Sequence, residues 1–342
     1  MSWRLFLTLF ILASILIACG KDPAIPNQQT INLTIPEGFP QPNIPPGNPI
    51  TKAKLKLGKA LFYETGISRD SSVSCASCHF QFAAFSDPRA LSTGVEGRSG
   101  FRNSQALFNL AWRPNFFRDG GVQTLELVAL NALHANSEFD SNTPEMLRKL
   151  QSSARYRDLF RLAFNDTVSI QGALFALASF QRSLISGNSN YDRYTNGKDS
   201  NALSESQVRG MNLFFSNKTN CSDCHSGFNF TKEGFFANGL FPAYPDSGRQ
   251  RITLFESDRN KFSIPSLRNI EKTAPYMHNG EVANLEDVIE GYNLGGFDVQ
   301  NKDSLIRPLG LSADEKADLL SFLLSLTDND FLNNQDFQPD ND

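Results

Sequence analysis

The chain has 342 residues, of which 40% are hydrophobic and 20% charged, so it has room for one large domain or two domains of ordinary size. Lysine and arginine total 32 while aspartate and glutamate total 36, and the net charge of −4 leaves no basic excess for binding nucleic acid. The 29 phenylalanines supply enough large apolar side chains to exclude a wholly disordered chain.

The N-terminus predicts export. An uncharged apolar run at residues 5–18 follows Arg4, and at fourteen residues it is short for a membrane-spanning helix but typical of a signal-peptide core. The run ends in Leu16-Ile-Ala-Cys19-Gly20, which resembles a bacterial lipobox, where a signal peptide of residues 1–18 is removed and Cys19 is lipidated. The alternative is an ordinary secretory signal with an incidental cysteine. We therefore expect an exported protein on the periplasmic side, held to a membrane only through its lipid.

Residues 19–50 are rich in proline. They contain eight of the 17 prolines of the chain, and this density removes backbone hydrogen-bond donors and favours extended conformations. The composition predicts a semi-rigid tether between the lipid anchor and the folded body. An ordered arm that wraps round the body is the alternative.

The body that follows is predicted to be mainly helical. Its first helix begins near Thr51, and both Thr143-Pro144 and Ser312-Ala-Asp-Glu315 are helix starts by their capping residues. Strand-like alternation is scarce, and long connections rich in glycine, asparagine, serine and aspartate lie between the helices. After the first helix, helical periodicity recurs at residues 122–133, 145–164, 168–186, 204–216, 284–292 and 312–326.

A weak internal repeat divides the body. The string Gly-x-x-Leu-Phe at residues 58–62 precedes Cys-x-x-Cys-His at residues 75–79, and the same order recurs at residues 210–214 and 221–225, with the two cysteine motifs 146 residues apart. Two similar modules, divided near residues 187–197, are the simplest account of this order.

The expected organisation follows from that division. An N-terminal domain should occupy residues 51–190 and a C-terminal domain residues 191–326. Residues 327–342 form an acidic tail, because they hold five aspartates and no cation.

The two Cys-x-x-Cys-His motifs predict covalently bound haem. Cysteines three residues apart on a helical turn present both sulfurs on one side, as two thioether bonds to haem require, and the adjacent histidine reaches the iron. A Cys₄ zinc site usually has its pairs about 15–20 residues apart, and disulfides are the other alternative in an exported protein. After Cys19 the motifs use every remaining cysteine, so we expect two haem c groups. The attachment residues are Cys75, Cys78 and His79 in the first module and Cys221, Cys224 and His225 in the second.

Between residues 48 and 326 the chain resembles the bacterial dihaem cytochrome c peroxidase family, which includes the MauG-like enzymes. The resemblance implies a mainly α fold of two cytochrome c-like domains, each enclosing one haem c, with long irregular loops. It also implies reduction of hydrogen peroxide to water with electrons from a small periplasmic redox protein, a cytochrome c or a cupredoxin. Relatives often dimerise, which is the one ground for expecting a homodimer. The strings that carry the resemblance are Phe85-Ser-Asp87, Arg102-Asn-Ser104, Phe117-Arg-Asp-Gly120, Pro265-Ser-Leu-Arg-Asn269, Thr273-Ala-Pro-Tyr-Met-His-Asn-Gly280 and Leu285-Glu-Asp-Val288.

Individual roles follow from the same resemblance. His79 would bind the iron of the peroxidatic N-terminal haem, and His225 the iron of the C-terminal haem that receives electrons. Glu138 matches the distal glutamate that moves a proton between the peroxide oxygens, and a solvated loop glutamate is the alternative. Oxygen donors also match a calcium site between the domains. These donors are the Asn103 side chain and the backbone carbonyls of Thr273 and Pro275.

The sequence departs from the family pattern at the iron ligands. Many family peroxidases carry a capping histidine sixteen residues beyond the proximal one, where this chain has Val95, so the N-terminal iron is predicted to be open. His134 is an alternative ligand, although helix packing explains it better. Fourteen residues after His278, where the peroxidases place a methionine ligand, stands Tyr292, as in MauG-like proteins. Met277 is the rival ligand, and an unligated tyrosine is a third arrangement.

Two further departures concern the space between and above the haems. Arg118 stands where a tryptophan commonly lies between the haems, so an aromatic station for electrons is lost, and its guanidinium could pair with haem propionates. Val128 stands where relatives use a glutamine, so the distal pocket is predicted to be drier.

Three functions are therefore compared. A dihaem peroxidase is the first, and a MauG-like oxidase acting on a protein or organic substrate is the second, favoured by Tyr292 and Val95 but opposed by Arg118. A non-catalytic electron carrier is the third. It would need strong ligands on both sides of both irons, which Val95 disfavours.

Overall fold

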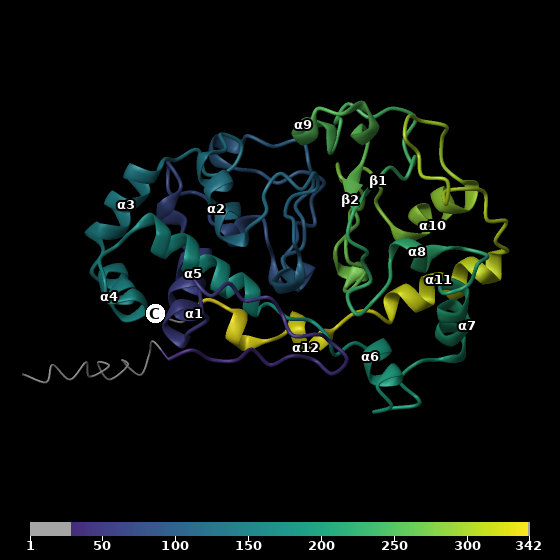
Figure 1. Cartoon of the computed structure of the whole chain (residues 1–342), viewed down its shortest axis with the longest axis horizontal. Helices are drawn as coiled ribbons and strands as arrows, with labels where there is room; N and C mark the ends of the chain where they lie inside the picture. Colours follow the sequence, from purple (N-terminus) through teal and green to yellow (C-terminus); the bar gives the residue numbers. More distant parts are fainter. Residues whose placement is uncertain (1–28, 341–342) are drawn as a thin grey trace, which may run out of the picture.

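The computed structural model describes residues 29–340, and Figure 1 shows two helical halves lying side by side along the long axis. The predicted signal peptide, the lipidated Cys19 and the first part of the proline-rich segment lie outside the described residues. Strand within residues 29–340 is limited to one antiparallel pair, β1 (Phe235–Phe236) and β2 (Phe262–Ser263). In that part of the chain, none of the helices combines the length and apolarity needed to cross a bilayer. The mainly α fold predicted from the sequence is confirmed.

The helices of each half follow one another in chain order. The N-terminal half contains α1 (Lys52–Tyr63), α2 (Leu125–His134), α3 (Thr143–Ser152), α4 (Ala154–Phe164) and α5 (Ile170–Ser183). The C-terminal half contains α6 (Asn190–Thr195), α7 (Glu205–Phe214), α8 (Cys221–Cys224), α9 (Gln250–Thr253), α10 (Leu285–Leu294) and α11 (Ala313–Leu324), and α12 (Asn329–Leu332) follows. Short 3₁₀ turns occupy Thr65–Ile67, Cys75–Ser77, Gln81–Ala83, Val95–Gly97, Leu110–Trp112, Glu256–Asp258, Ile270–Lys272 and Gln335–Phe337.

Most predicted helices are found, with one correction. The periodicity at residues 145–164 predicted a single helix, whereas the structure has α3 and α4. The break lies at Ser153, whose backbone is extended and whose hydroxyl accepts the Tyr156 amide as the N-cap of α4. A serine that caps a new helix competes with continuation of the preceding one, and apolar periodicity does not register this competition.

The weak sequence repeat corresponds to a repeated helix crossing. In the N-terminal half α1 packs on α5, and a Cβ at Gly58 would lie 2.0 Å from the Ala176 carbonyl oxygen. In the C-terminal half α7 packs on α11, and a Cβ at Gly210 would lie 1.9 Å from the Asp318 carbonyl oxygen. Each glycine therefore permits a close approach of two helix backbones that any larger residue would block.

Replacing Gly210 with alanine is expected to destabilise the protein by about 1–3 kcal/mol, because the new methyl group forces α7 away from α11. Urea denaturation of the purified holoprotein measures the change. Gly47→Ala is the matched control, since no atom lies within 4 Å of a Cβ built there. Equal stabilities of the two variants would contradict the close crossing.

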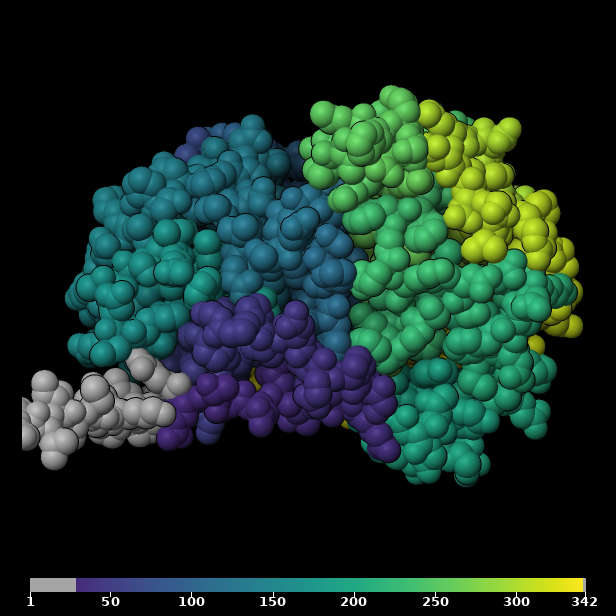
Figure 2. Space-filling view, viewed as in Figure 1, coloured from purple at the N-terminus to yellow at the C-terminus, as the bar shows by residue number. Residues whose placement is uncertain are grey.

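The proline-rich segment, where it is described, lies along the body. Ile31 donates its amide to the Ile50 carbonyl at 2.9 Å, and the Asn48 side chain hydrogen-bonds Glu126 at 3.0 Å. Farther along the surface, the Phe39 ring contacts Trp112 of the N-terminal half and Phe228 of the C-terminal half. In Figure 2 this purple segment runs beneath both halves. Residues 29–50 thus form the ordered arm that the sequence left open as an alternative to a tether.

The acidic C-terminal segment returns to the N-terminal half. Phe331 and Phe337 are buried in the N-terminal core, where both contact Phe85. Tyr63 of α1 donates its hydroxyl to the Phe337 carbonyl at 2.8 Å, and in Figure 1 the yellow ribbon that follows α12 runs to α1. The aspartates among residues 327–340 therefore flank aromatic residues that complete the first core, and this described part of the segment packs on the body as an integral part of it.

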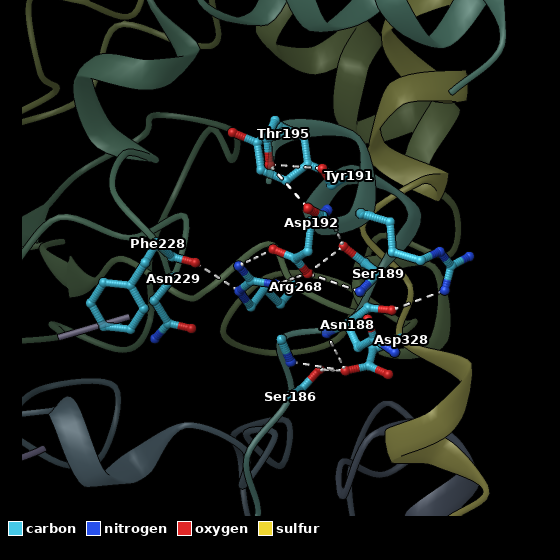
Figure 3. Close-up of polar contacts among 12 residues, drawn as sticks. Ser186, Asn188, Ser189, Tyr191, Asp192, Thr195, Phe228, Asn229, Arg268 and Asp328 are labelled. Atoms are coloured by element: carbon cyan, nitrogen blue, oxygen red, sulfur yellow. Dashed lines mark hydrogen bonds and ion pairs between the residues drawn. The ribbon is translucent and has the colours of Figure 1, made fainter. Parts of the chain in front are cut away.

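A polar cluster holds this return in place (Figure 3). The Asp328 carboxylate accepts hydrogen bonds from the Ser186 hydroxyl and the Gly187 and Asn188 amides, at 2.8–3.0 Å. Nearby, Arg268 forms a two-pronged ion pair with Asp192 at 2.7 and 2.8 Å. The Asp328 contacts fix the C-terminal segment to the connection between the two halves, and the Arg268–Asp192 pair stabilises the C-terminal half beside it.

Candidate functional site

Both Cys-x-x-Cys-His motifs form short helical turns, one in each half. The first cysteine pair belongs to the 3₁₀ turn Cys75–Ser77 and the residue after it, and the second forms α8. None of the four cysteines within residues 29–340 forms a disulfide. Over the same described residues, no group of three or more His, Cys, Asp or Glu side chains is placed so that it could hold a metal ion.

The motif histidines are oriented in the same way. The Nδ1 atom of His79 lies 2.8 Å from the Phe85 carbonyl oxygen, and that of His225 lies 3.1 Å from the Phe230 carbonyl oxygen. A carbonyl only accepts hydrogen bonds, so Nδ1 carries the proton and Nε2 remains available to a metal. Burial lowers the pKa of His79 and lowers that of His225 to about 4, so both rings are neutral near pH 7.

The C-terminal half contains a cavity of about 240 Å³ beside its motif. The cavity is lined by Cys221, Cys224 and His225, with Tyr292 and Met277 also on its wall. Most of the remaining lining is apolar, from residues such as Phe214, Ile289, Leu319 and Leu323. An apolar cavity that contains two thiols, an imidazole and a further donor fits a covalently bound haem.

Asn238 lies between the two rival iron ligands. Its Nδ2 atom is 3.4 Å from the Tyr292 hydroxyl and 3.4 Å from the Met277 sulfur. The Tyr244 hydroxyl donates to Asn238 Oδ1 at 2.9 Å, and the Leu240 amide donates to the same oxygen, which fixes the amide orientation. Burial raises the pKa of Tyr292 to about 12, and the Asn238 hydrogen bond opposes that rise. The phenol and the thioether thus reach one wall of the same cavity.

Glu138 faces the motif of the N-terminal half. Burial raises the pKa of both Cys75 and Cys78, and the negative charge of Glu138 adds a smaller rise to each. Loss of contact with water raises the pKa of Glu138 itself. By its accessible surface Glu138 is an exposed residue, so the rise of its pKa reflects the protein atoms packed round the carboxyl group and not complete burial of the side chain. A carboxyl in these surroundings can hold and release a proton.

The turn that contains Val95 packs against the loop that contains Glu138. Val95 is completely buried and donates its amide to the Glu138 carbonyl at 2.9 Å. A Cβ at Gly94 would lie 2.6 Å from that carbonyl oxygen, so glycine allows the two loops to meet. Val128 of α2 lies partly buried against the same core. His134 is exposed and its Nε2 lies 3.5 Å from Thr143, which agrees with a place at the end of α2 and not with an iron ligand.

Comparison with known proteins identifies the family. The sequence profile of the di-haem cytochrome c peroxidase family matches residues 52–200. Cytochrome-c peroxidase IdrP1 of Pseudomonas sp. (strain SCT) is 34% identical over 322 residues, which cover 84% of each chain. MauG of Methylophilus methylotrophus is 36% identical over 305 residues, which cover 86% of this chain and 89% of MauG. The chain belongs to the di-haem cytochrome c peroxidase family.

Solved structures of family members have the same fold. A MauG-like protein associated with microbial copper homeostasis has a TM-score of 0.85 and 33% identity over 90% of this chain and 99% of its own. The diheme peroxidase BthA of Burkholderia thailandensis has a TM-score of 0.71 at 20% identity, covering 89% of this chain and 97% of BthA. As a di-haem family member, the chain is an oxidoreductase with two haem c groups, and the predicted family resemblance is confirmed.

The donors predicted for calcium meet at the junction of the two halves. Asn103, Thr273 and Pro275 line one cavity of about 90 Å³. However, Arg118 lines the same cavity and donates its Nη2 to Asn103 Oδ1 at 2.9 Å. A guanidinium therefore already bonds the side-chain oxygen that calcium would require, and these residues do not fit the ion.

Several site residues escaped the sequence analysis. Asn238 and Tyr244 carried no motif signal, and Tyr292 lies 54 residues beyond Asn238 in the chain. Arg113, which lines the junction cavity, was likewise not singled out. Two polar residues that are so far apart in the chain form no short sequence pattern, so their contact could not be predicted from the sequence.

Proposed function

We propose that the protein is a dihaem c-type peroxidase that reduces hydrogen peroxide to water with electrons from a small periplasmic redox protein. The proposal is supported chiefly by Glu138, a carboxyl with a raised pKa whose backbone carbonyl accepts the amide of the non-ligating Val95, and whose charge acts on the Cys75 thiol. Relatives named cytochrome-c peroxidase support it. The electron donor and a homodimer stay predictions.

In this proposal each half holds one haem through its own motif. Cys75 and Cys78 form the thioether bonds of the N-terminal haem, and His79 provides its proximal nitrogen. The equivalent attachment in the C-terminal half uses Cys221, Cys224 and His225. When bound, the haem irons supply a site for peroxide and the electrons for its reduction. The Phe85 and Phe230 carbonyls hold the two imidazoles in the required tautomer.

Glu138 manages the proton that peroxide cleavage requires. Its carboxylate takes the proton from one peroxide oxygen and returns it to the other, which leaves as water when the O–O bond breaks. Two electrons and two further protons convert the remaining oxygen into the second water. The raised pKa of Glu138 brings its proton affinity closer to neutral pH, where both transfers are feasible. Buried Val95 offers no group that could ligate iron or compete for this proton.

A MauG-like oxidase that acts on a protein or organic substrate is the second candidate. Relatives named MauG support it, as does Tyr292, whose hydroxyl reaches the cavity of the C-terminal motif. Arg118 at the position of the usual tryptophan opposes it, because a guanidinium cannot carry an electron hole between the haems.

Rapid mixing of the fully oxidised holoprotein with a slight excess of hydrogen peroxide tests the proposal. We expect a fast change of the Soret band without prior reduction, because Val95 cannot cap the N-terminal iron. Rapid return of the spectrum with an added electron donor supports the peroxidase, and a long-lived changed spectrum supports the oxidase. A reaction that requires half-reduction would show that another residue caps that iron. If peroxide changed the Soret band in neither redox state, only the electron-carrier function would remain.

Tyr292→Phe tests the ligand of the C-terminal haem. The variant should lose the electron paramagnetic resonance signature of the oxidised C-terminal haem, because phenylalanine has no donor atom. Met277→Leu removes the rival donor from the same cavity wall and should leave that signature unchanged. The opposite pair of results would assign the thioether as ligand.

Export and lipidation are also part of the proposed function. Signal-peptide removal before Cys19 would place a diacylglycerol on that cysteine and tie the protein to the periplasmic face of a membrane. Cys19→Ser should shift the protein from the membrane fraction to the soluble periplasmic fraction without loss of haem. A variant that stays membrane-bound would argue against the lipid anchor.

A further inference from the structure

Arg118 connects two chain segments that each contact the opposite half. Its backbone carbonyl accepts a hydrogen bond from the Ser263 amide of β2 at 2.7 Å. Its guanidinium donates to Asn103 twice, from Nη2 to Oδ1 at 2.9 Å and from Nε to the backbone oxygen at 3.2 Å. The backbone N–H of Asn103 in turn donates a hydrogen bond to the His278 carbonyl at 2.8 Å. The Arg118 side chain therefore links two segments of the N-terminal half at the points where both meet the C-terminal half.

The orientation of the Asn103 side chain is fixed from the other side. Its Nδ2 lies 3.2 Å from the Arg89 carbonyl oxygen and 3.3 Å from that of Ala90. Because both partners are acceptors, this end of the amide must be the nitrogen, and Oδ1 must face Arg118. Asn103 is only 5% exposed, so solvent cannot replace these contacts. Asn103 Oδ1 therefore faces the junction and accepts its hydrogen bond from the Arg118 guanidinium.

The junction cavity already carries positive charge. Arg113 lines it together with Arg118, and both acceptors of the Arg118 guanidinium are neutral oxygens. Burial, followed by the charges of Arg102 and Arg113, lowers the pKa of Arg118 to about 10, while the Asp246 carboxylate acts in the opposite direction; Arg118 is therefore protonated near pH 7. A divalent cation bound to Asn103 would therefore lie beside a permanent like charge with little water to screen it.

We propose that in this chain the Arg118 guanidinium occupies the oxygens of Asn103 that calcium would use, so that the junction of the two halves forms without a metal ion. A guanidinium is suited to this position, because it is a planar cation with five donors in a rigid fork. It can bond the side-chain and backbone oxygens of one asparagine together, as the observed pair of contacts shows. Thr273 and Pro275, which line the same cavity, are then free of metal coordination.

The first test uses the wild-type holoprotein with both haems. Elemental analysis should find calcium far below one ion per chain. The midpoint of thermal unfolding should be the same in excess calcium chloride and in a calcium chelator. One calcium ion per chain, or a lower midpoint in the chelator, would overturn the proposal whatever the variants show.

Arg118→Gln tests the cause, because it removes the charge and keeps a side chain of similar polarity. The variant should gain calcium affinity, seen by titration calorimetry and as a rise in its unfolding midpoint of about 5 °C at a calcium concentration near 100 times Kd. Arg118→Lys keeps the charge and should stay insensitive to calcium. The double variant Arg118→Gln, Asn103→Ala should lose the gained affinity. A folded Arg118→Gln variant with both haems and no calcium affinity would overturn the proposal.

Discussion

Replacing Glu138 with glutamine is expected to lower the rate of peroxide turnover by about 10²–10⁴-fold while both haems stay attached. Glutamine has nearly the same shape but cannot accept and return a proton. Steady-state kinetics with a reduced donor protein measure the rate, and the absorbance spectrum checks that haem content is unchanged. Because removal from water raises the pKa of Glu138, the acid limb of the wild-type pH–rate profile should lie above the ordinary carboxyl range and disappear in the variant.

Glu96→Gln is the matched control for Glu138. Glu96 follows Val95 on the loop that meets Glu138, but its side chain is 60% exposed and forms an ion pair with Arg69. The same chemical change at this position should leave turnover and its pH profile as in the wild type. If both variants lost activity to the same extent, the effect would belong to the loop and not to proton transfer. Unchanged turnover in Glu138→Gln would remove Glu138 from the mechanism.

Arg268→Ala is expected to lower the free energy of unfolding by about 3–5 kcal/mol. The Arg268 side chain is 1% exposed and that of Asp192 is 8% exposed, so the substitution leaves an unpaired buried carboxylate. Arg268 also donates to the Phe228 carbonyl at 2.7 Å and lies over the ring of Phe39 in the arm (Figure 3 shows the polar contacts). Urea denaturation of the holoprotein measures the loss.

The pH dependence of that loss separates charge from packing. Burial alone would raise the pKa of Asp192, but the hydrogen bonds and charge of Arg268 hold it below its usual value. A depressed carboxyl pKa stabilises the fold above the unfolded-state value and loses this contribution as the pH falls through the folded-state value. The difference between wild type and Arg268→Ala should therefore shrink toward acid pH, where Asp192 becomes neutral. A difference independent of pH would mean that packing alone is lost.

An exposed ion pair of the same geometry provides the control for Arg268. Arg209 contacts Asp318 through two hydrogen bonds of 2.7 and 2.9 Å, but the Arg209 side chain is 59% exposed. Arg209→Ala should destabilise the protein far less, because the remaining Asp318 carboxylate is 15% exposed to water and keeps the hydrogen bond that the Ser206 hydroxyl donates at 2.6 Å. If Arg268→Ala folds poorly, Asp192→Asn removes the charge from the other side of the same buried pair, and its loss of unfolding free energy can be measured instead.

The junction explains why such contacts matter for a protein with two redox centres. Electron transfer between haems depends on their separation and orientation, which the contacts between the halves fix. Those contacts include the Asp328 cluster, the arm at Phe39, over whose ring Arg268 lies, and the segments that the Arg118–Asn103 link joins. Weakening any of them should loosen the junction before it disturbs the attachment of either haem.

The sequence by itself determined the features whose information lies in adjacent residues. The Cys-x-x-Cys-His motifs predicted haem c because attachment and ligation use five consecutive positions. Capping residues predicted helix starts such as Ser312, whose hydroxyl accepts the Glu315 amide in α11. The spacing of Gly58 and Gly210 before the motifs revealed the repeat that the two helix crossings share. Family strings along residues 48–326 gave the di-haem assignment that the relatives bear out.

Only the tertiary structure decided the features that join distant residues. The return of Phe337 to α1, the packing of the arm under both halves and the Arg118–Asn103 link all depend on the path of the folded chain. The proposal that Arg118 replaces calcium rests on such a contact, because matching donors in the sequence do not show that a guanidinium reaches the same oxygen. Such contacts arise from burial and hydrogen-bond satisfaction between segments far apart in sequence, and no local pattern encodes which partner each polar group will find.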